Sequence, residues 1–434
     1  MGHVTNPHKT YHLLQQRLDR NVTGAPESPA LMQILRLLFS PEEADLACQI
    51  PTRFISLDRL ARKVDIPPEA LDDRITALAE RGLVVDLIRD ERRYVSLAPV
   101  VIGFFEFTFM RVREDAPMKE LSELFEVYMF ENPAFAHAVF AGETQIGRSL
   151  VREEALPDEP TTEILDWERA SYLVESARAH AVSLCACRHH ALHQERACPA
   201  PMRTCMTLNG AAEMLTRSGI AEAISTREAM AILAESKEAG LAQTADNVQQ
   251  DVGYICNCCG CCCGMMAAIR HMDIRNAIVT SNWIAHVDPE RCRGCGRCAK
   301  ACPVNAIEMV SDEVDGRKRK WAVRDPELCL GCGVCYSRCK YGALSMQARE
   351  QRVLTPETTF DRMVAMAIER DKLGDLLLDN VDGWSAHALA RVVQVLEKTP
   401  APRALKAIGP LKSIYLQAVV RGAKTGAGQG AQMM

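Results

Sequence analysis

The C-terminal half of the chain contains Cys292-Arg293-Gly294-Cys295-Gly296-Arg297-Cys298-Ala299-Lys300-Ala301-Cys302-Pro303 and, after a gap, Cys329-Leu330-Gly331-Cys332-Gly333-Val334-Cys335-Tyr336-Ser337-Arg338-Cys339. Both segments have the spacing C-x2-C-x2-C-x3-C. Three thiolates separated by two residues curl around one corner of a compact metal group, and the small glycines between them let backbone amides approach the sulfurs. The sequence therefore predicts two thiolate-bound metal groups.

This spacing is typical of a pair of [4Fe-4S] clusters in which the fourth cysteine of each segment binds the other cluster. We therefore expect two ligand sets, which are Cys292, Cys295, Cys298 and Cys339 for one cluster and Cys329, Cys332, Cys335 and Cys302 for the other. A structural zinc site is the alternative, but it requires two C-x2-C pairs and only four ligands in all.

The segment of about residues 285–348 thus resembles the bacterial two-cluster ferredoxins. The resemblance implies a small fold of paired strands and helices with pseudo-twofold symmetry, and a low-potential electron-transfer role. One departure is visible, because Pro303 follows the first fourth cysteine whereas Lys340 stands where the second copy would have its proline. That departure affects the local turn and not the ligands.

The whole chain has 434 residues, a net charge of −5 and 19 cysteines. The charge gives no general attraction to nucleic acid or to anionic membranes. We find no secretory signal and no apolar run long enough to cross a bilayer, so we expect a cytoplasmic protein. In a reducing compartment clustered thiols indicate metal and not disulfides, and iron–sulfur sites favour an anaerobic or microaerobic host.

We expect an α+β, multidomain protein. Its predicted parts are a flexible lead-in (1–27), a winged-helix-like domain (28–100), a helical connecting region (101–165), a helical cysteine-rich iron–sulfur domain (166–284), the ferredoxin-like domain (285–350), C-terminal helices (351–421) and a disordered tail (422–434).

The winged-helix prediction is based on a series of helices, the last of which ends at Gly82, and on the two strands that follow it. Serines at 40 and 56 are suited to cap two of these helices. A DNA-binding role would need a basic recognition helix, but residues 68–82 hold four acids against two bases. We therefore expect a protein-docking or structural role and no nucleic-acid partner.

Ten further cysteines form a second field in two groups. The first group is Cys185, Cys187, Cys198 and Cys205, and the second is Cys256, Cys258, Cys259, Cys261, Cys262 and Cys263. Soft thiolates in this number predict at least one additional iron–sulfur cluster. Our first ligand set is Cys185, Cys187, Cys198 and Cys205, and our second is Cys256, Cys258, Cys259 and Cys262.

Other arrangements of the field stay open. Adjacent cysteines point in different directions, so the run of six cannot face a single cubane, and ligands from both groups can be shared. A cluster with bridging thiolates, a zinc site and a redox-active dithiol are further alternatives. Arg188 beside Cys187 is suited to neutralise the charge of a cluster, and His189, His190 and His193 are candidate ligands, proton carriers or ordinary surface residues. Cys48 is expected to be a buried thiol without a metal.

The order of these parts resembles a poorly characterised group of iron–sulfur proteins of anaerobic bacteria. The resemblance lies in a winged-helix-like N-terminus, the C-x-C-R segment at Cys185, the C-N-C-C-G-C-C-C segment at Cys256 and the dicluster module. It implies a redox complex and does not identify a substrate.

Toward the C-terminus, Asp315-Gly316 followed by a basic run predicts a hairpin that can steer an acidic partner, and helical patterns cover about residues 357–372, 385–398 and 402–420. The last pattern is basic and amphipathic, so peripheral membrane contact is one of its possible roles.

We expect an electron-transfer subunit or carrier of an anaerobic oxidoreductase system, with a redox protein or a larger complex as partner. The alternatives are a reductase with a catalytic cluster in the cysteine-rich domain and a redox-sensing winged-helix regulator. No nucleotide-binding motif supports a self-contained NAD or flavin enzyme.

Overall fold

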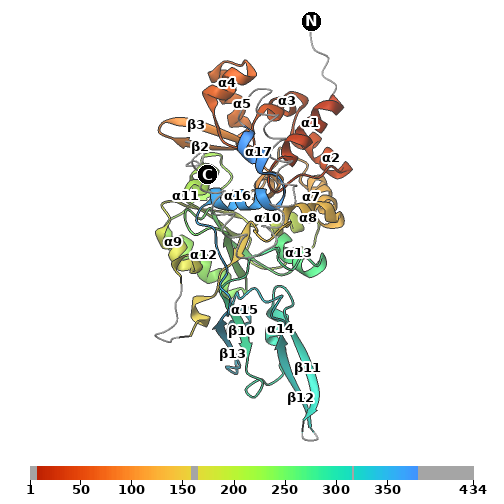
Figure 1. Cartoon of the computed structure of the whole chain (residues 1–434), viewed down its shortest axis with the longest axis vertical. Helices are drawn as coiled ribbons and strands as arrows, with labels where there is room; N and C mark the ends of the chain where they lie inside the picture. The colour runs from red at the N-terminus through yellow and green to blue at the C-terminus, as the bar shows by residue number, and fades with distance from the viewer. Residues whose placement is uncertain (1–6, 158–164, 315–316, 380–434) are drawn as a thin grey trace, which may run out of the picture. The chain divides into compact units, whose positions relative to one another are not determined.

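A computed structural model describes residues 7–157, 165–314 and 317–379. The chain divides into two compact units. The first comprises residues 1–144, 217–220 and 358–434, and the second comprises residues 145–216 and 221–357. The mixture of helices and strands in Figure 1 agrees with the predicted α+β class.

The first unit is largely helical. Its helices are α1 (Pro7–Asp19), α2 (Pro29–Leu38), α3 (Pro41–Gln49), α4 (Leu57–Val64), α5 (Pro68–Glu80), α6 (Phe105–Phe109), α7 (Met118–Glu126), α8 (Pro133–Val139), α16 (Thr359–Glu369) and α17 (Leu373–Leu378). Strands β1 (Ile55–Ser56), β2 (Val84–Arg89) and β3 (Arg92–Leu97) form a sheet in the order β1-β3-β2.

Helix caps in this unit follow the sequence closely. The Ser40 hydroxyl accepts a hydrogen bond from the backbone of Glu43, and Ser56 does the same for Arg59, so both predicted caps are confirmed. The helix that begins at Pro68 ends beside Gly82, whose φ of +74° suits a glycine.

The N-terminal lead-in requires a correction. We expected residues 1–27 to be flexible, but residues 7–19 form α1, and Leu14 and Leu18 on it are buried. These two side chains lie one helical turn apart and face the core, a pattern that the polar composition of the segment had concealed.

The second unit is built on a six-stranded antiparallel sheet in the order β4-β8-β9-β6-β5-β7. These strands are β4 (Gly147–Ser149), β5 (His180–Leu184), β6 (Arg203–Leu208), β7 (Glu222–Ala223), β8 (Ala242–Asp246) and β9 (Tyr254–Cys258). The helices between them are α9 (Ala170–Ser176), α10 (Ala186–Leu192), α11 (Asn209–Arg217), α12 (Thr226–Glu238) and α13 (Gly264–His271).

This sheet corrects our prediction of a helical cysteine-rich domain over residues 166–284. Strand β8 is buried along its whole length, including the polar Gln243 and Thr244. It therefore lacks the alternation of apolar and polar residues that reveals a half-buried strand in a sequence. Helix α12 begins with a capping box between Ser225 and Glu228.

The two faces of the sheet differ in chemistry. Val182, Met206 and Ile255 belong to a hydrophobic core that also contains residues of α9 and α12, two helices that lie together in Figure 1. Because side chains alternate along a strand, Cys205 and Cys256 point to the opposite face. The sheet therefore has an apolar face and a thiol-bearing face.

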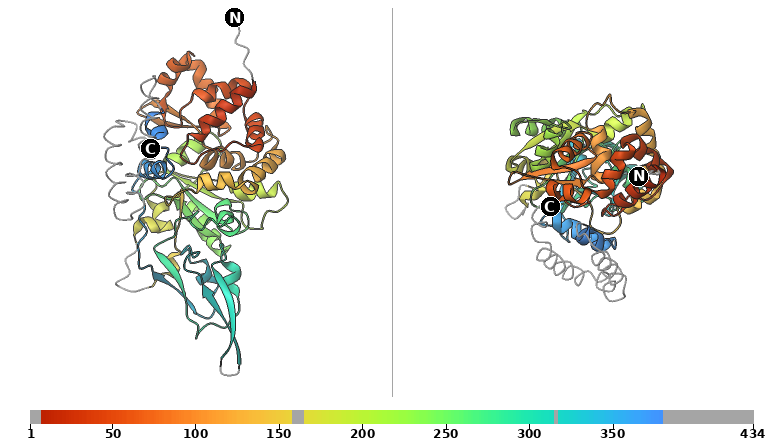
Figure 2. Two further views of the ribbon diagram at one scale, coloured as in Figure 1. Left: turned by 45° about the vertical axis from the view of Figure 1, so that its right-hand side comes forward. Right: turned by 90° about the horizontal axis from the view of Figure 1, so that it is seen from above.

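The described part of the second unit also contains two strand pairs and two short α-helices. Strand β10 (Trp283–Val287) pairs with β13 (Leu344–Ala348), and β11 (Ile307–Val314) pairs with β12 (Arg317–Arg324). Helices α14 (Arg297–Ala301) and α15 (Val334–Arg338) pack together. Figure 2 shows β11 and β12 side by side as a long ribbon.

The C-terminal predictions lie partly within the described residues. The helical pattern near 357–372 is confirmed by α16, which belongs to the first unit. The turn at 315–316, the helices predicted at 385–398 and 402–420 and the tail from 422 lie outside the described residues.

Candidate metal centres

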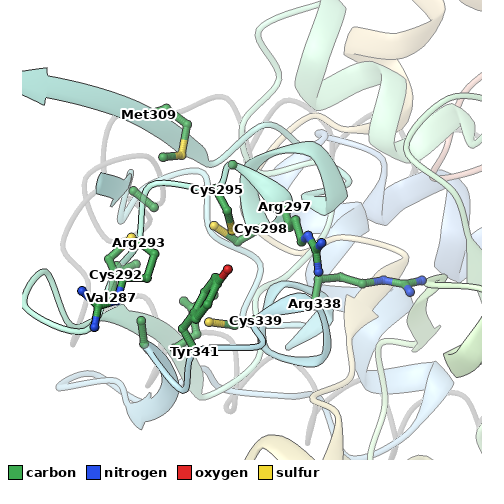
Figure 3. A pocket seen from close by; sticks show the side chains of 14 residues that line it. Val287, Cys292, Arg293, Cys295, Arg297, Cys298, Met309, Arg338, Cys339 and Tyr341 are labelled. Atoms are coloured by element: carbon green, nitrogen blue, oxygen red, sulfur yellow. The ribbon is translucent and has the colours of Figure 1, made fainter. Parts of the chain in front are cut away.

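Two hollows in the second unit are lined by the cysteines of the repeated motif. The outer hollow, with about 340 Å³ of empty space, lies among Cys292, Cys295, Cys298 and Cys339. Figure 3 shows the sulfurs of Cys295, Cys298 and Cys339 and the ring of Tyr341 around the same space. Three of the four cysteines belong to the first segment and one to the second.

The inner hollow, with about 320 Å³, has the complementary composition, because Cys302 joins Cys329, Cys332 and Cys335. The three cysteines of the second segment are buried, whereas Cys295 of the outer hollow is exposed. The cysteines of the outer hollow are therefore more accessible than those of the inner hollow.

The backbone around the inner hollow accounts for a glycine in the motif. Gly331 has a φ of +71°, and a Cβ atom there would lie 2.1 Å from the carbonyl oxygen of Trp283. A side chain is excluded both by conformation and by space. The backbone N–H of Ala306 also donates to the Cys302 sulfur at 3.2 Å, a contact typical of thiolates that bind iron.

Two arginines that no sequence motif predicted lie next to the inner hollow. The backbone N–H of Arg152 donates to the Cys332 carbonyl at 3.2 Å, and the guanidinium of Arg349 donates to the Cys329 carbonyl at 2.5 Å. Burial raises the pKa of the Cys332 thiol to about 12. A thiolate there therefore needs positive charge nearby, which iron and these arginines can supply.

The ten cysteines of the second field separate into two sets that the sequence groups do not match. Cys198, Cys259, Cys261 and Cys262 form one set, the four-thiol group, with all sulfurs within 4.8 Å of one another. It takes one member from the first sequence group and three from the second. The structure thus places Cys198 apart from the other members of our first predicted ligand set.

The other six thiols, the six-thiol group, gather at the thiol-bearing face of the sheet. They are Cys185, Cys187, Cys205, Cys256, Cys258 and Cys263. Cys256 lies next to Cys205 and Cys258, and Cys263 lies next to Cys187 and Cys258. Contact with Cys256 and Cys263 lowers the pKa of Cys258 to about 6, and Thr244 adds a hydrogen bond at 3.4 Å.

Arg188 lies between the two sets. Its side chain is fully buried, and it donates to the Asn257 carbonyl at 3.1 Å and to the Thr204 hydroxyl. Burial lowers the pKa of Arg188, but Cys185 and Cys259 outweigh that effect and raise it. A buried guanidinium that faces sulfur is best explained by anionic thiolates around it. Arg188 thus lies beside thiols of both sets, and its role as a counter-charge to a metal centre stays a prediction.

The histidines beside Arg188 lie on α10. His189 and His190 are buried, and burial together with His189 lowers the pKa of His193. Cys48 lies in α3 of the first unit, where burial raises the pKa of its thiol to about 12. A high pKa suits an inert thiol.

The loop that holds the four-thiol group contacts the dicluster segment. The backbone of Gly260 packs against Pro303, the residue after Cys302 of the inner hollow. The inner hollow therefore adjoins the second cysteine field within one compact unit.

Comparison with known proteins gives one match. Residues 291–343 match the family model of the 4Fe-4S dicluster domain. The chain is an iron–sulfur protein, and this domain gives it an electron-transfer role. No curated protein and no solved structure matches the chain. Within the described ranges, the helices are all too short or too polar to span a membrane.

Proposed function

We propose that this protein is an electron-transfer subunit or carrier of an anaerobic oxidoreductase system in the cytoplasm. It passes single electrons through two [4Fe-4S] clusters, one in each hollow. The observation that carries the proposal is the composition of the hollows, since each is lined by three cysteines of one segment and the fourth of the other. Clusters that exchange their fourth ligands are held close together, which favours rapid transfer between them.

The exposure of the two hollows suggests the direction of the route. The outer cluster is the one that a partner can approach, because Cys295 and Tyr341 are exposed. The inner cluster has mostly buried cysteines and adjoins the second cysteine field through the contact of Gly260 with Pro303. Electrons therefore enter or leave at the outer cluster and exchange with the field through the inner one.

We further propose that the six-thiol group holds an additional iron–sulfur cluster. Six neighbouring thiols exceed the four ligands that a cubane needs, so some can bridge irons or hydrogen-bond to the cluster. The buried charge of Arg188 offsets the negative charge of such a cluster.

The partner that this arrangement suits is an acidic redox protein. Arg293 and Arg297 are exposed residues that line the outer hollow, and the exposed Lys320 lies on β12. Positive charge around an accessible cluster speeds the encounter with an acidic protein. The winged-helix-like region of the first unit is then a protein-docking module, because its α5 carries more acids than bases.

Counting iron and acid-labile sulfide on protein purified without oxygen tests this proposal. Two [4Fe-4S] clusters alone give about eight sulfides per chain, and a further cluster in the six-thiol group raises this to about twelve. After reduction, electron paramagnetic resonance should show two [4Fe-4S]⁺ centres with magnetic coupling. A colourless protein, or one with zinc and no sulfide, would contradict the electron-transfer role.

The same preparation separates the alternatives. A reductase with a catalytic cluster would be reoxidised by a substrate without any partner protein, whereas a carrier stays reduced until an acceptor is added. A redox-sensing regulator would bind duplex DNA in a salt-dependent way that changes with oxidation state.

A further inference from the structure

The four-thiol group differs from the ferredoxin-type sites in the distances between its sulfurs. All pairs among Cys198, Cys259, Cys261 and Cys262 lie within 4.8 Å, and the sulfurs of Cys261 and Cys262 are 3.8 Å apart. Among the described residues, no three cysteines of either hollow approach one another this closely.

The difference has a physical meaning. In a cubane each thiolate binds a different corner, so the sulfurs are separated by the width of the cube as well as by their bonds to iron. The cysteines of the outer and inner hollows line an open space in which such a body can lie. The four-thiol group has its sulfurs drawn together around a single point.

A single metal ion accounts for this spacing. Zinc–sulfur bonds of about 2.3 Å in a tetrahedron place the sulfurs about 3.8 Å apart, and ferrous iron is bound by four thiolates in a similar geometry. We propose that Cys198, Cys259, Cys261 and Cys262 hold one divalent ion, zinc or iron, in a tetrahedral site without inorganic sulfide.

The local chain explains how neighbouring cysteines reach one ion. Cys259, Cys261 and Cys262 lie in the tight loop between β9 and α13, and Cys198 comes from the loop before β6. The backbone N–H of Cys262 donates to the Cys259 sulfur at 3.4 Å, as is common in metal-binding loops. The flanking Cys258 and Cys263 belong to the six-thiol group, so the run is divided between two centres.

Charge also fits a divalent ion. Four thiolates around an M²⁺ ion carry a net charge of about −2. Arg188, which is buried, faces Cys259, and Arg270 donates to the carbonyl of Gly260 within the loop. A dithiol–disulfide pair explains the group less well, because it would use only two of the four sulfurs and a bond of about 2.05 Å.

The experiment compares metal and sulfide contents of the full-length protein with those of two variants, Cys198→Ser and Cys261→Ser. Cys48→Ser is the matched control, since that thiol lies in the other unit. Either test variant should lose about one zinc or one iron per chain with its sulfide content unchanged, and the element lost identifies the ion. The sulfide count reports the clusters of the proposed function separately, so the two proposals can fail independently.

Two results would overturn the site. The loss of about four irons together with about four sulfides would make it a cubane, and an unchanged metal content would mean that the thiols bind no metal. If the variants do not fold, unmodified protein expressed with cobalt in place of zinc decides the matter. It should show the red absorption bands of tetrahedral thiolate-bound Co²⁺, and their absence would also overturn the proposal.

Discussion

Gly260 lies so close to Pro303 that a Cβ atom at Gly260 would be 2.7 Å from the Pro303 carbonyl oxygen and 3.0 Å from its Cα. Two backbone segments therefore meet with no room for a side chain. One segment belongs to the second cysteine field and the other follows a cysteine of the inner hollow. This contact places the second cysteine field next to the inner hollow. A substitution that adds one methyl group at Gly260 would disturb it.

Gly260→Ala should therefore lower the stability of the second unit by about 1–3 kcal/mol, because backbone must move to admit the methyl group. Gly253→Ala is the control, since its nearest atom would be an ordinary 3.5 Å away. Urea unfolding followed by cluster absorbance measures the difference. Equal midpoints for the two variants would contradict a tight contact at Pro303.

Exchange of the fourth ligands can be tested with pairs of substitutions. Cys302→Ser combined with Cys332→Ser should damage only the inner cluster and remove about four irons. Cys302→Ser combined with Cys295→Ser should damage both clusters and remove about eight. Iron and sulfide counts measure these losses. If the first pair removed about eight irons and the second pair about four, each segment would bind its own cluster.

Removal of the buried charge at Arg188 should destabilise the thiol centres. Arg188→Met leaves anionic thiolates without their buried counter-charge, which typically costs about 3–5 kcal/mol. We expect a lower melting temperature and loss of metal from the second cysteine field, while the two ferredoxin-type clusters stay. Arg196→Met, at an exposed neighbouring position, is the control and should retain all metal.

The sequence predicted the parts of this protein whose determinants are local. The helix caps at Ser40 and Ser56 depend on residues within one turn, and both are present. The dicluster motif has fixed spacing, so its two segments could be recognised without a structure. The extra helix α1 was missed because its polar residues outnumber the few buried leucines.

In the second cysteine field, the sequence did not predict which cysteines come together. Cys198 joins Cys259, Cys261 and Cys262 although the chain between them forms four strands and two helices. Pairing of this kind depends on the order of strands in the sheet, which spacing along the chain does not encode. For the same reason the sequence did not predict that Arg152 and Arg349, which lie outside the motif, contact cysteines of the inner hollow.

The stability of the first unit should depend on Glu106. Burial raises the pKa of this carboxyl to about 7, while the backbone N–H of Gly103 donates to it at 2.9 Å. The folded chain holds the proton more tightly than the unfolded chain. The stabilising contribution is therefore complete below the ordinary carboxyl pKa of about 4.3 and is lost as the pH rises through about 7.

Glu106→Gln keeps a neutral acceptor at this position, so its melting temperature should exceed that of the unmodified protein at about pH 8 and approach it at about pH 5. Thermal unfolding at the two pH values tests this. Glu120→Gln, on the exposed surface of α7, should show no such change. A difference that is the same at both pH values would mean that Glu106 does not titrate in this range.

The positive surface at the outer hollow should control the rate at which charged reagents exchange electrons with the protein. Arg293 and Arg297 are exposed at the rim of this hollow, close to Cys295. Replacing both with glutamate changes the local charge by four units, which should slow reduction by the dithionite-derived anion about tenfold at low salt. A cationic viologen radical should react faster with the same variant.

Stopped-flow absorbance measures both rates, and Arg227→Glu on α12 is the control. Because salt screens surface charge, both effects should fade at high ionic strength. If anionic and cationic reductants responded alike, electrons would enter elsewhere than at the outer hollow.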